Sequence, residues 1–348
     1  MSTDTPSANK PGDLTRILER HRAFWDRSDV DEPLVRVTNY SSEEVIEPLP
    51  LVDGSVAQDG DLVEPEKVSV DRITEAQQLL ADALDGDFLR GVEPYDLCWT
   101  EVLAGCGIRW QMGNLWAEPY LEDLSDPNSL RVADDNPWMA KFDAVVGQLV
   151  DQAAGRYPIT QPSLRGPIDI AAAAVGDTQI CMAAMEDPEP LGRFLEACTD
   201  VFLAAIKRWR SLSPLFEGGT CKFGIWAPGT IGQIQCDGAA LLSPDLYETL
   251  LVPCDTRICE QFDFPIMHTH GSAIKIVADA LIANPGLRAI QVSTDYPAGP
   301  PFADLLPTLQ KINAEKPLIV TGGVSQDEFR QLKDGLDPRG LCLLMEVY

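Results

Sequence analysis

Two of the three histidines in the chain stand one residue apart, at the end of an apolar run. His268 and His270 close the segment 264–270, and residues two apart in a β-strand share a face. Both imidazoles would then point to one place, where they could bind a metal ion or an anionic substrate. The alternative is a pair of solvated histidines at the end of a surface strand, and the neighbouring residues must decide between the two.

Carboxylates end two neighbouring segments in the same way. Asp237 ends the predicted strand 232–237, and Asp295 ends the predicted strand 287–295. If these strands are parallel neighbours of the histidine strand, the carboxylates meet the histidines at one edge. We expect both to be catalytic groups, although Asp295 precedes a Tyr-Pro pair and serves equally well as a turn residue.

Two imidazoles and one carboxylate form a known zinc site, which leaves a fourth position open for substrate or water. We predict zinc at His268 and His270, with Glu346 at the end of the last strand as the third ligand. Asp237 and Cys342 are alternatives for that third position. A thiolate would favour zinc more strongly, but Cys342 lies four residues before Glu346.

A polar face and an apolar face can be separated on each predicted strand by reading every second residue. In a barrel the outward face must be apolar because helices cover it, so the polar face points inward. By this reading six side chains are candidates for binding a substrate: Arg36, Arg165, Lys222, Trp226, Gln235 and Gln291.

Short β-rich runs alternate with helical segments along the chain, and each break is marked by Pro, Gly or Asp. Eight strands with intervening helices indicate a (β/α)8 TIM barrel, whose active site lies at the C-terminal ends of the strands. The expected strands are 34–40, 159–165, 222–227, 232–237, 264–270, 287–295, 317–321 and 341–347. Helices are expected at 13–27, 189–212, 244–262, 272–283, 302–315 and 325–335.

A long insertion separates the first two expected strands. We expect one domain, residues 1–348, in which 41–150 form an elaboration over the barrel mouth. The aromatic segment 95–120 within it would close over the pocket as a lid that excludes water. Since no helix follows the last strand, the helix at 13–27 would cover that side of the barrel.

The charge of the chain limits its partners. Fifty-four acidic residues stand against 27 basic ones, which gives a net charge of −27. Nucleic acid and anionic lipid are repelled by such a charge, so neither is an expected partner. The N-terminal residues lack the pattern of a signal peptide, and no long uninterrupted apolar stretch occurs. We therefore expect a soluble cytoplasmic protein whose nine cysteines are reduced thiols.

Several short motifs occur together between Arg16 and the end of the chain. They are 24–37, Gly105-Cys106-Gly107 with Trp116-Ala117, Gly166-Pro167-Ile168-Asp169, Asp237 with Leu241-Leu242-Ser243-Pro244, and His268-Thr269-His270-Gly271. In this combination the chain resembles the uroporphyrinogen decarboxylase superfamily. That superfamily includes the true decarboxylase and zinc-dependent, corrinoid-linked methyltransferases.

The departures from the superfamily pattern favour the methyltransferase branch. The true decarboxylase has Arg-Gln-Ala-Gly-Arg for propionate binding where this chain has Arg36-Val37-Thr38-Asn39-Tyr40, which argues against a porphyrinogen substrate. The methyltransferases have His-x-Cys-Gly and a late cysteine, where this chain has His268-Thr269-His270-Gly271 and Glu346. The resemblance implies zinc held by His268, with His270 in place of a thiolate, and a methyl group carried on the corrinoid of a partner protein.

Two other functions stay open. One is a cofactor-free decarboxylase, in which Arg36, Arg165 or Lys222 holds a carboxylate while Asp237 or Asp295 stabilises developing positive charge. The other is a barrel that binds a small molecule without catalysis. Barrels host many chemistries, so the fold alone does not choose among them.

Overall fold

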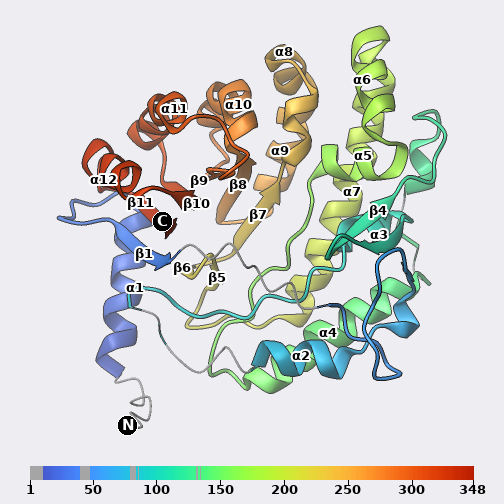
Figure 1. The fold of residues 1–348 in the computed structure, drawn as a ribbon, viewed down its shortest axis with the longest axis horizontal. Helices are drawn as coiled ribbons and strands as arrows, with labels where there is room; N and C mark the ends of the chain where they lie inside the picture. The colour runs from blue at the N-terminus through green and yellow to red at the C-terminus, as the bar shows by residue number, and fades with distance from the viewer. Residues whose placement is uncertain (1–10, 40–47, 79–83, 85, 131, 134) are drawn as a thin grey trace.

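Six parallel strands form the main sheet of the structure (Figure 1). This computed structural model describes residues 11–39, 48–78, 84, 86–130, 132–133 and 135–348. The strands follow the order β1-β11-β10-β9-β8-β7, so the first strand of the sheet pairs with the last strand of the chain. They are β1 (Leu34–Asn39), β7 (Ile231–Gln235), β8 (Phe264–His270), β9 (Ala289–Ser293), β10 (Leu318–Val324) and β11 (Leu341–Val347).

The helices that follow β8, β9 and β10 return along the outside of the sheet. α10 packs on β8 and β9, α11 on β10, and α12 on β11. Ser325 begins α12 with a capping box, in which Ser325 and Glu328 each accept the main-chain N–H of the other. The predicted helices are confirmed to within one residue for α7 (Pro188–Leu212), α10 (Gly271–Ala283), α11 (Phe302–Glu315) and α12 (Gln326–Gly335), and to within two for α1 (Pro11–Trp25).

The helix predicted at 244–262 is divided. Ser243 caps it as expected, but α8 (Pro244–Leu246) passes into a π-helical turn over Tyr247–Leu251 before α9 (Val252–Cys259) begins. Pro253 explains the change, because proline has no N–H to donate to the helix ladder and a wider turn accommodates the missing bond.

The chain has a mixed α/β fold, and the described residues do not form a closed barrel. The predicted strand 159–165 makes only isolated parallel bridges, Val92 with Ile159 and Arg165 with Gln235. Between these bridges, the Gln161 side chain takes the place of a main-chain ladder. Its Nε2 donates to the carbonyl of Gln233 at 2.7 Å, and its Oε1 accepts the N–H of Gln233 at 2.9 Å.

The predicted strand 222–227 is instead a hairpin of β5 (Thr220–Lys222) and β6 (Ile225–Ala227). Phe223 and Gly224 form its two-residue turn, with φ of +55° and +77°. Two left-handed residues in succession are typical of a type I′ turn, which joins antiparallel strands and interrupts a parallel one.

The face of the sheet that carries the histidines changes from apolar to polar along the strands. Toward the N-terminal ends, Ile266 of β8 and Ile231 of β7 are fully buried with the side chains of Ile225 and Phe24. Toward the C-terminal ends the same face carries Gln291, His268 and other polar groups. The apolar half forms a closed floor under the polar half, and its remaining members are Trp25, Leu34, Phe88, Ala227, Ala289, Ile319 and Cys342.

Trp226, a predicted substrate residue, is buried in a separate apolar cluster with Ile17, Leu18, Leu89 and Cys221. It is 1% exposed, and its indole N–H donates to the carbonyl of Phe216 at 2.9 Å. Its main-chain N–H donates to Nδ1 of the buried His21 at 3.0 Å. Nε2 of His21 lies 2.8 Å from the carbonyl of Asp87, so the neutral imidazole donates there and accepts from Trp226.

We expect His21 to make the stability of the fold depend on pH. Burial lowers the pKa of His21 from 6.5 to about 4. Between these values the unfolded chain takes up a proton that the folded chain does not, so acid lowers the free energy of unfolding, by up to ~3 kcal/mol. His21→Gln removes this term. Denaturant unfolding should therefore show a gap in stability between the wild type and the variant that narrows from pH 7 to pH 4.5. An equal gap at both pH values would contradict the assignment.

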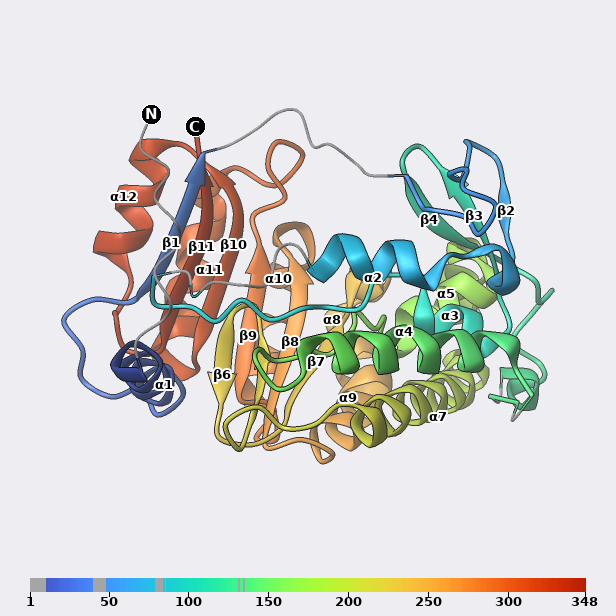
Figure 2. The same ribbon diagram turned by 90° about the horizontal axis from the view of Figure 1, so that it is seen from below.

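The insertion after β1 builds a separate layer (Figure 2). An antiparallel sheet of β2 (Leu62–Val63), β3 (Gly107–Gln111) and β4 (Asn114–Glu118) lies at the opposite end of the molecule from α1 and α12. Trp99 and Trp110 of the aromatic segment are buried, so much of its aromatic character serves packing. The other elements of this half are α2 (Val70–Gln78), α3 (Trp99–Ala104), α4 (Pro137–Ala153), α5 (Pro167–Val175), α6 (Asp177–Glu186) and the 3-10 turns Pro65–Lys67 and Pro127–Leu130.

All nine cysteines lie in the described part of the chain, and all are free thiols. No single helix among the described residues is both long and apolar enough to cross a membrane. α5 and α6 reach that threshold only when taken together, and they are bent by 109° where they meet.

Candidate metal centre

Three side chains converge where β7 and β8 end. β8 presents His268 and His270 on one face, and the 3-10 turn Asp237–Leu241 that follows β7 begins with the third residue. Oδ1 of Asp237 lies 3.2 Å from Nε2 of His270 and 3.6 Å from Nε2 of His268. One ligand atom from each residue lies within 4.8 Å of the other two. The predicted histidine pair therefore has a carboxylate between its ring nitrogens.

These separations fit a small divalent ion. Zinc binds nitrogen and oxygen at about 2.0–2.1 Å, so neighbouring ligand atoms of a tetrahedral site are about 3.3 Å apart. The two nitrogen–oxygen distances, 3.2 and 3.6 Å, lie on either side of that value. All three ligand atoms lie within 4.8 Å of one another, so the three residues could hold such an ion.

His268 is held in the form that a metal ligand requires. Its Nδ1 is hydrogen-bonded to Oε1 of Gln291, whose Nε2 donates to the Thr321 hydroxyl at 2.6 Å. The proton on Nδ1 leaves Nε2 with a lone pair directed toward Asp237. Burial lowers the pKa of His268 and keeps the ring neutral. Gln291, predicted to bind substrate, has its side-chain amide bonded to His268 and Thr321.

His270 lies between two carboxylates. Nε2 faces Asp237, and Nδ1 lies 2.5 Å from Oδ1 of Asp295. These hydrogen bonds, with Asp237 and then Asp295, raise the pKa of His270 to about 10. A divalent ion would replace the proton between His270 and Asp237, while Asp295 fixes the ring from behind, as carboxylates commonly do for metal-bound histidines. Asp295 also accepts the N–H of Ser272 at the start of α10, at 3.3 Å.

Asp237 is held on both sides. Burial raises its pKa, but the hydrogen bond with His270 and the positive charge of that ring lower it overall. Gln235, a predicted substrate residue, donates to Oδ2 of Asp237 at 2.7 Å. The buried Asp169 accepts the main-chain N–H groups of Asp237 and Gly238, at 3.1 and 2.6 Å, and so fixes the turn.

Asp169 was not among the predicted site residues, although it ends the motif 166–169. Burial, and then the charge of Asp237, raise its pKa to about 8. A carboxylate placed beside another one in this way is costly, which is more typical of a functional site than of simple packing.

The structure brings Asp237 to the histidines rather than Glu346, the first choice for the third ligand. β10 and β9 lie between β11 and β8, so three strand spacings, roughly 14 Å along the sheet, separate Glu346 from the histidines. Cys342, the other alternative, lies in the apolar floor, where burial raises the pKa of its thiol and keeps it protonated.

Two of the predicted basic substrate residues are held by carboxylates. Nε of Arg165 lies 3.1 Å from Oε1 of Glu101, which is 2% exposed, and its guanidinium also reaches Asp96 at 3.3 Å. Lys222 is buried, and its Nζ donates to Oε2 of Glu93 at 2.7 Å. These carboxylate partners could not be predicted from the sequence. They belong to the insertion after β1, and no local pattern in the insertion indicates which strands it contacts.

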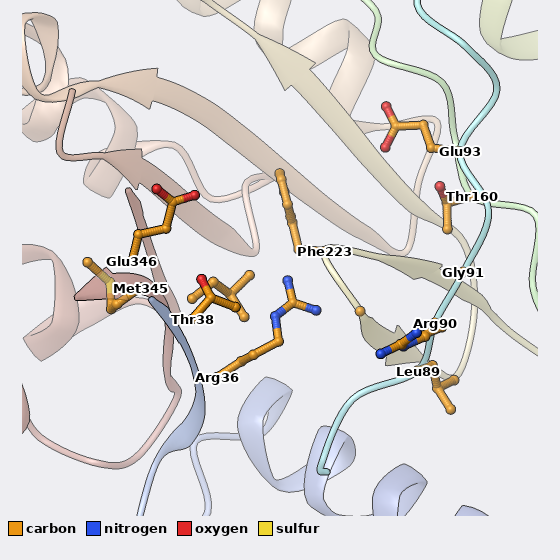
Figure 3. A pocket seen from close by; sticks show the side chains of 12 residues that line it. Arg36, Thr38, Leu89, Arg90, Gly91, Glu93, Thr160, Phe223, Met345 and Glu346 are labelled. Carbon is orange, nitrogen blue, oxygen red and sulfur yellow. The ribbon is translucent and has the colours of Figure 1, made fainter. Parts of the chain in front are cut away.

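A cavity of about 570 Å³ lies between the C-terminal ends of β1 and β11 and the segment 88–93 (Figure 3). Arg36, the remaining predicted substrate residue, extends from β1 into its middle. Arg90 lies on the opposite side, and Glu346 and Glu93 stand at its margins. The cavity and the histidines therefore share the polar end of the sheet.

The fold is similar to that of a solved methyltransferase from Methanosarcina mazei. The two structures superimpose with a TM-score of 0.61 over 95% of this chain and 93% of the other, at 15% sequence identity. At that identity the similarity shows the fold alone. No protein-family model and no curated protein sequence matches the chain.

Proposed function

We propose that this protein is a metal-dependent enzyme that transfers a methyl group to or from a small molecule. Asp237, His268 and His270 would hold the ion, with zinc as the first candidate. The observation that carries the proposal is the convergence of three ligand atoms within 4.8 Å, each oriented by a second side chain. The methyltransferase fold of the solved neighbour supports the reaction class.

The residues around the site have separable tasks. When bound, zinc lowers the pKa of a coordinated thiol or water. Gln291 keeps the lone pair of His268 in place, and Asp295 does the same for His270. Two imidazoles and one carboxylate donate less electron density than thiolates do, so this ligand set favours a strong Lewis acid. Asp237 supplies the one negative charge among the three ligands.

We propose a methyl-corrinoid on a partner protein as the donor. The sequence motifs shared with the uroporphyrinogen decarboxylase superfamily support this donor, and membership of that superfamily is part of the proposal. We also infer that segments 88–93 and 158–165 occupy the second and third places of an irregular eight-stranded barrel, because their parallel bridges continue the sheet past β7. Closure of segment 95–120 over the mouth remains a prediction.

The decarboxylase alternative has less support. It needs a cation to hold a carboxylate, and both Arg165 and Lys222 already bind carboxylates of the protein. Arg36 alone among the three lines the cavity.

Metal analysis tests the proposal directly. Protein purified without chelator should contain close to one divalent ion per chain, as measured by elemental analysis, and chelator-treated protein should take up one equivalent of zinc. Asp255→Asn offers a matched control, because Asp255 is a buried aspartate bonded to Tyr247 and is not one of the three candidate ligands, so this variant should still bind metal. Protein without metal that takes up none on addition would overturn the proposal, and turnover of a carboxylated substrate by that protein would favour the decarboxylase.

A further inference from the structure

The loop after β9, residues 294–300, connects a candidate metal ligand to the end of another strand. Asp295 in this loop holds Nδ1 of His270 through its Oδ1, at 2.5 Å. Tyr296, the next residue, stacks its ring on that of Tyr348, with 4.4 Å between the ring centres and 25° between the planes. His270 ends β8 and Tyr348 follows β11, and β9 and β10 lie between these two strands. Two neighbouring loop residues therefore join the metal ligand to the end of β11.

The backbone of Asp295 has an uncommon conformation. Its φ is +57°, in the left-handed region that residues other than glycine seldom adopt. Two hydrogen bonds close the turn around it. Its N–H donates to Oγ of Ser293 at 3.2 Å, and its carbonyl accepts the N–H of Gly299 at 2.6 Å. Such a conformation persists only where surrounding contacts hold it, so the neighbours of the loop determine where the Asp295 carboxylate lies.

Two consecutive glycines of β10 make room for this loop. Gly322 has a φ of +107°, and a side chain there would overlap the hydroxyl of Thr294. A methyl group at Gly323 would lie 2.8 Å from Cδ1 of the Tyr296 ring, which is too short for two carbon atoms. The Thr294 hydroxyl also donates to the carbonyl of Gly323 at 3.0 Å. Tyr296 is therefore held between the bare backbone of Gly323 and the ring of Tyr348.

We propose that Gly323 and Tyr348 are positioning residues of the metal centre, which act through the loop by holding Asp295 against His270. Their contacts with Tyr296 keep the loop in the conformation that places the Asp295 carboxylate behind the ring. That carboxylate fixes the ring and so the lone pair that His270 offers to the ion. The inference deepens the proposed function, on which it rests, because it extends the control of metal affinity to two residues outside the three ligands.

Zinc affinities, measured by competition with a chromogenic chelator, test the inference. Tyr348→Ala removes the stack, and an aromatic pair changes an equilibrium by a factor of roughly two to ten, so zinc affinity should fall by about that factor. Gly323→Ala should also lower the affinity, because its methyl group displaces Tyr296. Tyr348→Phe keeps the ring and should keep most of the affinity. Trp116→Ala is the matched control, since it removes an exposed aromatic ring from β4, and it should leave the affinity unchanged.

A double-mutant cycle shows whether Tyr348 acts through Asp295. Asp295→Gly removes the carboxylate and tolerates the positive φ of this position. In that background Tyr348→Ala should cost little further zinc affinity. A purely structural role for Tyr348 gives the same loss with and without Asp295. Equal losses in the two backgrounds, or an unchanged zinc affinity in Tyr348→Ala, would overturn the inference.

Spectra of the histidine rings measure the position of Asp295 without metal. The chain contains only three histidines, so in chelator-treated protein with isotope-labelled histidine the N–H signal of His270 is identified by its absence in His270→Ala. Tyr348→Ala should shift this signal, because the Nδ1 proton is shared with Asp295, and Tyr348→Phe should not. An unshifted signal in Tyr348→Ala would contradict the inference. Failure of the wild type to take up zinc counts against the proposed function alone, since the spectra still decide whether Tyr348 holds Asp295 in place.

Discussion

Replacing His270 by alanine should abolish stoichiometric metal binding and leave the chain folded. The substitution removes one of three ligands and also the partner that holds Asp237 and Asp295 together. Loss of groups that merely orient a ligand costs about 10–100-fold in metal affinity, so loss of the ligand itself should cost at least about a hundredfold, or ~2.7 kcal/mol. Competition with a chromogenic zinc chelator measures the change.

Two further measurements separate the loss of a ligand from a loss of structure. Asp295→Asn keeps all three ligands and weakens only the support of His270, so its loss of affinity should be smaller than that of His270→Ala. The side chain of His270 is 36% exposed and lies outside the apolar floor, so circular dichroism should show a folded variant. Unchanged zinc affinity, or a variant that does not fold, would favour a structural role for the histidine pair.

Replacing Arg165 by methionine should destabilise the fold by about 3–5 kcal/mol, because it leaves the buried Glu101 without its cation. Burial already raises the pKa of Glu101 against the opposing charge of Arg165. Without the arginine, Glu101 can escape by taking up a proton, which at pH 7 costs ~4 kcal/mol relative to an ordinary glutamate. Because Glu101 can be protonated, the loss in the free energy of unfolding stays within the expected range.

A double-mutant cycle measures this interaction. The variant Arg165→Met with Glu101→Gln removes both charges and should recover most of the stability lost in Arg165→Met alone. Free energies of unfolding from denaturant titration give all four corners of the cycle. A loss below about 1 kcal/mol for Arg165→Met would mean that the pair is not structural, and Arg165 would again be a candidate for the substrate.

The sequence was most informative where the chain follows a strict period of two. β8 and β11 have the predicted bounds, and the polar face was correctly located on both, because buried strands tolerate no shift of one residue. The same periodicity predicted that His268, His270 and Asp237 lie at one edge of the sheet. Serine caps at Ser243 and Ser325 located two helix starts in the same local way.

Other features depend on contacts that no local pattern records. The side chain of Gln161 substitutes for main-chain bonds, and nothing in its neighbours distinguishes it from an ordinary strand residue. Phe223-Gly224 is different, because a glycine in the middle of a predicted strand is itself a signal of a turn. The prediction for Glu346 had the correct face of the sheet but the wrong distance from the histidines. The alternation of side chains along a strand gives the direction of each side chain, but it does not give the number of strands between two residues.

The apolar floor has a consequence for the order of events during turnover. Its members are packed against α1 and the β5–β6 hairpin, so among the described residues that side of the sheet is filled by apolar side chains. The polar groups lie at the C-terminal ends of the strands, and under the proposed function substrate and product enter and leave there. A carrier protein that delivers a methyl group at these C-terminal ends covers the path of the product while it is docked. Under the proposed function, the carrier therefore has to depart before the product does, and its departure rate sets an upper limit on the turnover of the enzyme.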